Sequence, residues 1–324
     1  MTSPLTRRAL NDSDAAAYAA LSSAIVDAGG GDRREDEAMF RFYLNHPMAA
    51  HEFDDFQGVF DADRLVATAW VVRRDRAEPV HWMMSDGGVH PDYLGRGIGT
   101  ELVRWQARCA RRIHEHYLPG HPLELAARAA EGNAAARELL TNEGYALERW
   151  FFAMRRPAEV PLPRVSIPAD LELEPYTDAV RVELHGAVEE AFAEHWHHVP
   201  RTVEDWTAWL ARGEARLDLS FLLRDAADGE IAGFLLSAFK EPEFKATGVR
   251  DVHFSLIGTR RPYRGRGVAS ALIAHALRES GKLGFSGGAT LGVDAENPSG
   301  ALGVYERNGF ACAHRTANYV RKLG

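Results

Sequence analysis

Short runs of alternating apolar and polar residues are separated by stretches with helical spacing, and the clearest such unit lies near the end of the chain. Residues 252–258 (VHFSLIG) insert polar side chains between apolar ones, which predicts a half-buried strand. Residues 268–277 carry apolar side chains at 268, 272, 273, 276 and 277, which predicts a helix with one buried face. The turn between them, residues 260–267, contains two glycines and four arginines.

The same patterns predict alternating strands and helices over the whole chain. In the first half, the predicted strands are 5–10, 56–60, 65–73, 80–84, 123–127 and 150–154, and the predicted helices are 14–27, 35–44, 98–115 and 133–143. In the second half, the predicted strands are 171–176, 219–224, 231–239, 252–258, 289–293 and 317–320. The predicted helices there are 180–192, 203–211, 268–277 and one that ends near residue 308.

Two segments of the second half have counterparts in the first half. Residues 93–99 (YLGRGIG) match 263–269 (YRGRGVA), and residues 131–145 (EGNAAARELLTNEGY) match 296–310 (ENPSGALGVYERNGF). Both offsets are close to half the chain, which indicates an internal duplication. Prolines at 157, 161, 163 and 168 indicate an extended connector. We therefore expect two similar α/β domains, residues 1–156 and 170–324, joined by a linker at 157–169.

The composition limits the class of protein. The net charge of −8 argues against nonspecific binding to nucleic acid or to an anionic membrane. There are two cysteines, Cys109 and Cys312, and no spacing typical of a metal site or a disulfide framework. The sequence shows no apolar run that resembles a signal peptide or a membrane span. We expect a soluble cytoplasmic protein without metal, either a monomer or a homodimer.

The turn at 260–267 has the features of an anion site. The first amides of a helix have no partner inside the helix, and its dipole places partial positive charge there. Gly265 and Gly267 allow close approach of the backbone, and Arg264 and Arg266 add full charges. A diphosphate would fit such a site. The turn is not a Walker A loop, because no Gly-Lys-Ser/Thr follows, and it lacks the third glycine of a dinucleotide fingerprint.

Two motifs resemble one known family. Arg264-x-x-Gly267-x-Ala269 is similar to the pyrophosphate-binding motif of the GNAT superfamily of acyl-CoA N-acyltransferases. Asn297, followed by Tyr305-x-x-x-Gly309-Phe310, resembles the second signature of that family. Two fused copies resemble the mycothiol synthase-like and antibiotic-pathway members. The resemblance implies an α/β fold with a mixed sheet, in two tandem domains that each follow the order β-αα-βββ-α-β-α-β, and acetyl-CoA as co-substrate.

The resemblance also implies roles for residues of the second copy. It places cofactor-binding groups at Leu256, Ile257, Gly258, Arg264, Gly265, Arg266, Gly267, Val268 and Ala269, and at Asn297, which otherwise caps the next helix. Tyr305 occupies the usual acid position, unless it is an aromatic core residue. His253 occupies the position where family members often carry a glutamate. His253 is the expected base, or it holds a water molecule that acts as the base. The alternative is a half-buried strand histidine without a catalytic role. His195 and Trp196 are expected to contact the acceptor, unless they form a polar helix end.

The first copy keeps only part of this pattern. Leu94 stands at the arginine position, Leu140 at the tyrosine position, and Met83 at the position that matches His253. Glycines and an asparagine persist at Gly95, Gly97, Gly99 and Asn133. This copy could still bind CoA through backbone amides, but we expect it to be catalytically impaired.

The resemblance implies an acetyl-CoA-dependent N-acetyltransferase. The expected acceptor is the primary amine of a small molecule, such as an amino sugar, a cysteinyl conjugate or a secondary metabolite. Transfer would be direct, in a ternary complex within the second domain. The alternatives are a non-catalytic CoA-binding sensor or scaffold and a peptide N-terminal acetyltransferase.

Overall fold

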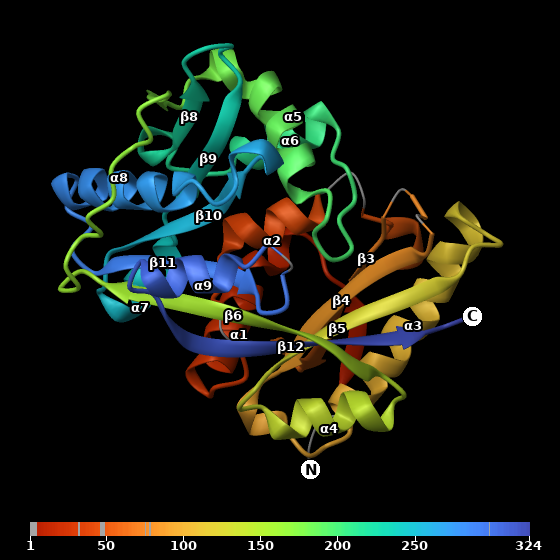
Figure 1. Cartoon of the computed structure of the whole chain (residues 1–324). Helices are drawn as coiled ribbons and strands as arrows, with labels where there is room; N and C mark the ends of the chain where they lie inside the picture. The colour runs from red at the N-terminus through yellow and green to blue at the C-terminus, as the bar shows by residue number, and fades with distance from the viewer. Residues whose placement is uncertain (1–4, 32, 46–48, 75, 78, 298) are drawn as a thin grey trace. The chain divides into compact units, whose positions relative to one another are not determined.

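The computed structural model describes residues 5–31, 33–45, 49–74, 76–77, 79–297 and 299–324. Its contacts separate into two compact units (Figure 1). Unit 1 is formed by residues 1–151 together with 314–324, and unit 2 by residues 152–313. Each unit is an α/β structure in which helices cover both faces of a mixed sheet.

The sheet of unit 1 follows the order β1-β2-β3-β4-β5-β12, with β4 and β5 parallel. These strands are β1 (Thr6–Ala9), β2 (Phe56–Asp61), β3 (Arg64–Val72), β4 (His81–Val89), β5 (Leu123–Ala130) and β12 (Ala311–Lys322). Helices α1 (Ala15–Asp27) and α2 (Glu37–Leu44) pack on one face, where Tyr18 and Phe40 meet Trp70. Helices α3 (Ile98–Tyr117) and α4 (Ala134–Asn142) pack on the other, around Met83 and Leu125.

The sheet of unit 2 follows the order β6-β11-β10-β9-β8-β7, with β10 and β11 parallel. These strands are β6 (Ala146–Pro157), β7 (Leu171–Pro175), β8 (Phe221–Asp225), β9 (Ile231–Ala238), β10 (Asp251–Thr259) and β11 (Gly288–Asp294). Helices α5 (Arg181–Phe192) and α6 (Val203–Leu210) pack on the face that carries Phe234 and Leu236. Helices α8 (Val268–Lys282) and α9 (Ala301–Arg307) pack on the face that carries Leu235 and Phe254.

The predicted fold class and element order are confirmed in both halves, with local differences: β6, β12 and α8 are longer than predicted, one helix is additional, and β4 extends further. Helix α7 (Glu241–Thr247) was not predicted; it begins with a proline in its first turn and ends at Gly248 in the left-handed conformation. Strand β4 continues five residues beyond the predicted end, through Gly87 and Gly88 to Val89. Glycines usually indicate a turn, but here the pairing of β4 with β3 keeps them extended.

The units do not coincide with the sequential boundaries 1–156 and 170–324. The last strand, β12, pairs with β5 over the register Thr316↔Ala130 to Lys322↔Glu124, so its final part belongs to unit 1. The second part of β6, from Phe152, belongs to unit 2. A sequence repeat gives the order of the elements, but it does not give the sheet that each terminal strand joins.

The proline-containing stretch 157–169 is fixed to unit 2. Val165 and Ile167 pack against the core of that unit. Arg156 is 1% exposed, and no carboxylate among the described residues pairs with it. Its guanidinium donates to backbone carbonyls: Nε to Asn308 O (2.9 Å), and Nη2 to Val160 O and Pro161 O (both 2.8 Å). Burial lowers the pKa of Arg156, but the hydrogen bonds to one carbonyl at the end of α9 and to two in the stretch 157–169 compensate the buried charge.

Replacement of Arg156 by leucine should destabilise unit 2, because three carbonyls lose their donor and one of them, that of Asn308, is buried. We expect the free energy of unfolding, measured by urea titration of the full chain, to fall by roughly 2–4 kcal/mol. The exposed Arg278 on α8 provides a matched control, and Arg278→Leu should change it by less than about 0.5 kcal/mol. Equal effects of the two substitutions would contradict the structural role of Arg156.

A pair of histidines is buried in unit 1. His81 is fully buried; its Nε2 lies 3.1 Å from Arg74 O, and its Nδ1 lies 2.8 Å from Nδ1 of His114. A carbonyl only accepts, so Nε2 carries the proton and Nδ1 of His81 accepts from His114. Burial, followed by the charge of His114, lowers the pKa of His81 to about 4. A second proton on His81 would bring two N–H groups face to face.

The burial of His81 should make the free energy of unfolding decrease as the pH falls. Its pKa is lower in the folded chain than the ordinary value near ~6.5, so the unfolded chain binds the extra proton between these values. The contribution is therefore full above about pH 6.5 and is lost as the pH falls toward 4, by at most about 3 kcal/mol. In urea titrations across this range, His81→Gln should show a smaller slope than the wild type. The exposed His314→Gln should keep the wild-type slope.

Candidate active site

Strands β10 and β11 of unit 2 pair only over their first halves. Their register runs from Asp251↔Gly288 to Phe254↔Leu291 and then stops, although both strands continue. On its other side, β10 pairs with β9 almost to its end, but the register shifts between Phe254 and Leu256. Ser255 is the extra residue of this β-bulge. The bulge therefore lies at the point where β10 loses its partner β11.

The backbone of β10 presents donors to this open edge. Arg260 N donates to Ala232 O on β9 (3.0 Å). In an antiparallel pair, the backbone N–H and C=O groups of every second residue face the partner strand. Leu256 and Gly258 therefore face β9, whereas Ile257 and Thr259 direct their N–H groups toward the open edge. Of the three strand residues expected to bind the cofactor, Ile257 is the one whose amide faces the gap.

The N-terminus of α8 follows this open strand. Gly265 and Gly267 adopt left-handed conformations (φ +77° and +82°), and the space around both is open. Gly267 is the N-cap, and no side chain caps the helix. No hydrogen bond in the described part of the chain uses the N–H groups of residues 265–270; the first helical bond runs from Ala271 N to Gly267 O (2.9 Å). Several amides therefore point outward at the positive end of a helix.

The arginines of this turn are held by carboxylates. Arg264 Nη1 donates to Glu194 Oε2 (3.0 Å), and this bond lowers the pKa of Glu194. Arg266 forms an ion pair with Asp170, and Arg260 bonds to Glu190 (2.7 Å) on α5. The sequence pattern did not indicate these acidic partners. They fix the turn, and the amides of residues 265–270 make no hydrogen bond within the described part of the chain.

Tyr305 lies on α9 in the core that also contains α8. It is 8% exposed, and its ring makes an edge contact with Phe310 at 6.2 Å between centroids. Burial raises the pKa of Tyr305 to about 12, so the phenol stays protonated at neutral pH. The buried Asn308, which the sequence pattern also did not indicate, joins α9 to the start of α8. Its Nδ2 donates to Ser270 Oγ and to Val304 O, both at 2.8 Å.

His253 lies on the face of β10 opposite α8. Its register partners are Ala238 on β9 and Thr290 on β11, and its Nδ1 lies 2.9 Å from Thr290 Oγ1. The neighbouring Asp251 is held by Arg155, whose Nε and Nη2 bond to the two carboxylate oxygens at 3.0 and 3.2 Å. Asp251 is therefore part of a structural ion pair, and His253 is the titratable side chain directed to the α5–α6 face.

Asn297 and the histidine-rich segment have local hydrogen bonds. Asn297 Oδ1 accepts from Ser299 N (2.9 Å), which forms the turn before α9. Between α5 and α6, His195 N donates to Phe192 O (2.8 Å), and the rings of Trp196 and His197 lie 4.5 Å apart. The described residues contain no group of three or more His, Cys, Asp or Glu that could hold a metal ion.

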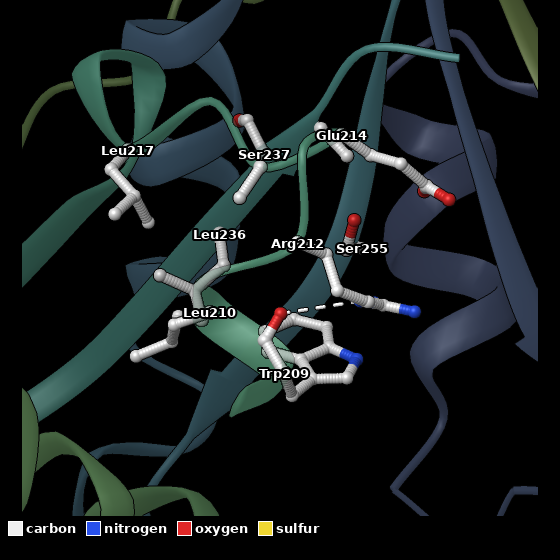
Figure 2. Close-up of a pocket in the computed structure, with 10 residues that line it drawn as sticks. Trp209, Leu210, Arg212, Glu214, Leu217, Leu236, Ser237 and Ser255 are labelled. Carbon is white, nitrogen blue, oxygen red and sulfur yellow. Dashed lines mark hydrogen bonds between the residues drawn. The ribbon is translucent and has the colours of Figure 1, made fainter. Parts of the chain in front are cut away.

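A small pocket opens on the α5–α6 side of β9 and β10 (Figure 2). Its walls include Trp209, Arg212, Glu214 and, from the bulge, Ser255. The empty volume is about 260 Å³ including its open part, and only a small fraction of it is enclosed. The enclosed part therefore holds about one water molecule or one small polar group. The sequence analysis placed acceptor contacts at His195 and Trp196 and did not indicate this pocket.

Comparison with known proteins identifies the family. The model of the acetyltransferase (GNAT) family matches residues 23–140 and 181–310. The chain belongs to the GNAT family. It is thus an N-acetyltransferase with two GNAT copies in tandem, and the family generally uses acetyl-CoA.

Relatives and solved structures agree with this assignment. The mycothiol acetyltransferase of Salinispora arenicola is 28% identical over 303 residues, which cover 93% of this chain and 91% of that protein. The enzyme of the same name from Nocardia farcinica is 31% identical over 255 residues, covering 74% and 75%. A GCN5-related N-acetyltransferase from Sphaerobacter thermophilus has a TM-score of 0.77 at 24% identity, covering 98% and 96%. A tandem GNAT protein from the clavulanic acid biosynthesis pathway has a TM-score of 0.72 at 15% identity, covering 99% of both chains.

Among the described residues, no helix has both the length and the apolar character needed to cross a membrane.

The first GNAT copy lacks the bulge. Strand β4 pairs with β3 from Ala67↔Val89 to Val72↔Met84 without a register shift, and its pairing with β5 ends at Met84↔Ala126. Because one residue is missing, Met84 rather than Met83 takes the place of His253. Met84 packs toward α1 and α2, whereas Met83 is buried against α3. The match of Met83 with His253 by a constant sequence offset was therefore wrong.

The open edge of the first GNAT copy carries its own acceptor. His90 N donates to Val66 O (2.8 Å), so Gly87, the counterpart of Ile257, directs its N–H away from β3. Asp86 Oδ1 accepts this N–H at 2.7 Å, and Arg128 on β5 forms an ion pair with Asp86. The amide that is open in the second copy is thus occupied by an internal carboxylate in the first.

The first GNAT copy keeps the glycine turn but not all of the side chains around it. Gly95 and Gly97 are left-handed (φ +73° and +78°), and Gly97 is the N-cap of α3 without a side-chain cap. Leu94 is 62% exposed, and Leu140 is buried in the core. Asn133 Oδ1 accepts from Ala136 N (3.0 Å), so this side chain caps α4.

Proposed function

We propose that this enzyme transfers an acetyl group from acetyl-CoA to the primary amine of a small molecule, directly and within a ternary complex, at the site of unit 2. One observation carries the proposal: the open half of β10, with the amide of Ile257 directed into the gap, leads to the uncapped N-terminus of α8. A donor for a thioester carbonyl and a site for a diphosphate therefore lie in one continuous segment.

The diphosphate of CoA would bind at the start of α8. The outward amides of Gly265 to Ala269 supply several donors in one concave turn, and the helix dipole favours negative charge there. The left-handed glycines leave open space above the backbone, so a bulky anion can approach. The arginine side chains of Arg264 and Arg266 would add long-range attraction while they remain held by Glu194 and Asp170.

The gap beside β10 would hold the thioester. Backbone groups on an unpaired strand edge can form hydrogen bonds with the amide groups of an extended ligand, here the arm of CoA, as in strand addition. In that position the carbonyl oxygen would accept from Ile257 N–H, with Leu256 and Gly258 as the flanking residues. A donor aimed at the oxygen that becomes negative in the transition state lowers the barrier by roughly 3 kcal/mol.

The acceptor amine would be deprotonated on the His253 side of the sheet. An alkyl ammonium is protonated at neutral pH, so a base must remove a proton before the nitrogen can attack. His253, or a water held by it, would take this proton. The new C–N bond then forms as the C–S bond breaks, and the electron pair of that bond leaves with the sulfur as thiolate. The amide nitrogen loses its second proton, and the thiolate takes up one proton, which gives the neutral amide and the thiol of CoA.

Tyr305 would stabilise the leaving thiolate. Because its pKa is about 12, the phenol is protonated and acts as a donor toward sulfur. Proton transfer from such a weak acid to a thiolate is uphill, so a hydrogen bond to the thiolate is the main contribution. Asn308 would keep α9 in register with the first turn of α8, where the diphosphate lies.

The first copy would bind CoA at most without turning it over. The amides near Gly95, Gly97 and Gly99 resemble those of the second copy, but Asn133 serves as a helix cap and Asp86 occupies the amide of Gly87. A carboxylate at that position repels a developing oxyanion, and Leu140 offers no donor to a thiolate.

A small acceptor is supported by the relatives, which are mycothiol acetyltransferases. The enclosed part of the pocket beside Ser255 would take no more than one small polar group of such an acceptor. His195 and Trp196, between α5 and α6, would contact the outer part of such an acceptor.

Acetyl-CoA binding can be assigned to one copy by calorimetry on charge-matched variants. Asparagine and aspartate both tolerate left-handed backbone, so Gly267→Asn and Gly267→Asp differ mainly by one negative charge. We expect Gly267→Asp to weaken acetyl-CoA binding at least about tenfold relative to Gly267→Asn, because a carboxylate would face the diphosphate. The pair Gly97→Asn and Gly97→Asp tests the first copy in the same way. Loss of binding only in Gly97→Asp would contradict the assignment to unit 2.

Turnover separates an enzyme from a binding protein. Tyr305→Phe removes the donor to sulfur but keeps the packing, so we expect kcat to fall about 10²-fold with acetyl-CoA affinity unchanged. The readout is thiol release from acetyl-CoA over a panel of small amines. Tight acetyl-CoA binding by the wild type without thiol release for any amine would support a sensor or scaffold and would refute the proposed transfer.

A further inference from the structure

Asn308 is buried where the end of α9 meets the first turn of α8. It is 3% exposed, and its Nδ2 donates to Ser270 Oγ and to Val304 O, both at 2.8 Å. A carbonyl only accepts, so the atom beside Val304 O is the amide nitrogen, and both of its N–H groups are in use. Ser270 Oγ is therefore the acceptor in the bond between the two helices.

The Asn308 amide is held in this orientation from several sides. Its backbone oxygen accepts from Nε of the buried Arg156 (2.9 Å). Its backbone N–H donates to Val304 O (3.2 Å) and to Tyr305 O (3.0 Å). A rotation of the side-chain amide would bring its oxygen against Val304 O, so Ser270 meets a donor at this position.

The hydroxyl of Ser270 keeps its own hydrogen for another acceptor. Serine in a helix often donates to the carbonyl four residues before it, here that of Arg266, but no such bond forms. No acceptor among the described residues takes this hydrogen. Ser270 is the third residue of α8, and helical side chains point toward the N-terminus of their helix. The hydroxyl thus lies beside the first turn, whose amides are also open.

The first GNAT copy does not have this arrangement. By the match of the motifs, Thr100 stands at the position of Ser270, and Glu143 at the position of Asn308. A carboxylate only accepts, so Glu143 cannot donate to a hydroxyl. It is bound instead by Arg104, through Nε (3.0 Å) and Nη2 (2.7 Å). The amide that donates to the first turn occurs only in the copy with the open strand edge.

A diphosphate only accepts hydrogen bonds, whereas a hydroxyl can donate or accept. A serine that donated inside its own helix would present only lone pairs to the anion. We propose that Asn308 is a positioning residue, which fixes the hydroxyl of Ser270 as a donor to the diphosphate of CoA. A donor that is already oriented loses little freedom on binding, and its bond to a charged oxygen is a strong one. This inference rests on the binding of CoA to unit 2 in the proposed function.

The test is a double-mutant cycle on the full-length protein, measured by calorimetric titration with acetyl-CoA. Ser270→Ala removes the hydroxyl. Asn308→Thr has a similar volume and can still donate to Val304 O, four residues before it, but is too short to reach Ser270. Thr100→Ala is the matched control at the corresponding position of the first copy. Thermal unfolding shows whether each variant is folded, and Asn308→Ser replaces Asn308→Thr if that variant is not.

We expect Ser270→Ala to weaken acetyl-CoA binding about tenfold, because a hydrogen bond to a charged group is lost. Asn308→Thr should weaken it about fivefold, because the released hydroxyl can then donate to Arg266 O. The double variant should match Ser270→Ala within about twofold, since Asn308 acts through the hydroxyl. In turnover, KM for acetyl-CoA should rise while kcat stays within about twofold, because the diphosphate is remote from the reacting bond. Thr100→Ala should bind as the wild type does.

Unchanged binding in Ser270→Ala would overturn the inference. A loss of about fiftyfold in the double variant, the product of the single effects, would also overturn it, because Asn308 would then act on the fold and not through Ser270. In both cases the proposed transfer stands if thiol release persists and Gly267→Asp binds more weakly than Gly267→Asn. If only Thr100→Ala weakens binding, the inference and the assignment of CoA to unit 2 both fail. If Ser270 and Asn308 are coupled but no amine releases thiol, the inference stands and the proposed transfer fails.

Discussion

The early end of the β10–β11 pairing is the constraint on which the proposed site depends. Backbone N–H and C=O groups require partners, and a parallel pair that stops at Phe254↔Leu291 leaves those of the following residues without a strand beside them. The pairing of β10 with β9 sets which amides face the gap, and the uncapped start of α8 continues the row of open donors. The binding of the diphosphate and of the thioester carbonyl proposed for unit 2 is thus performed mostly by main chain, with side chains such as Asn308 and Glu194 holding that main chain in position.

The comparison of the two copies shows how one residue can change a site. Ser255 has no counterpart in β4. Residues that match by a constant sequence offset before this point therefore direct their side chains to opposite faces in the two copies, as a one-residue shift requires in a strand. The first copy then places Asp86 beside the amide of Gly87 and pairs it with Arg128. The amide at its open edge is thus occupied by a carboxylate of the same copy. The glycine turn persists there, whereas counterparts of His253 and Tyr305 are absent.

Much of the architecture could be predicted from the sequence, because the strands and helices follow strong local periodicity and the two halves repeat the same motifs. The glycine turn and Tyr305 were found in the same way, since motifs of short range carry them. The bulge, the pairing of β12 with β5, and the partners of Arg264 and Arg266 were not predictable, because they depend on contacts between residues far apart in the chain. Glu194 and Asp170 look like ordinary surface charges in the sequence, and the pocket beside Ser255 has no local signature.

The exchange of terminal strands also determines the order in which the chain can fold during synthesis. Unit 2 is a continuous segment, residues 152–313, and all of it leaves the ribosome before the part of β12 that pairs with β5. Unit 1 needs residues 316–322 beside β5, and the terminal segment adds hydrogen bonds between Leu123 and the last two residues. The N-terminal half of this enzyme is therefore synthesised first but completed last, the reverse of the usual N-terminal-first order. Until the final residues are released, the edge of β5 remains exposed.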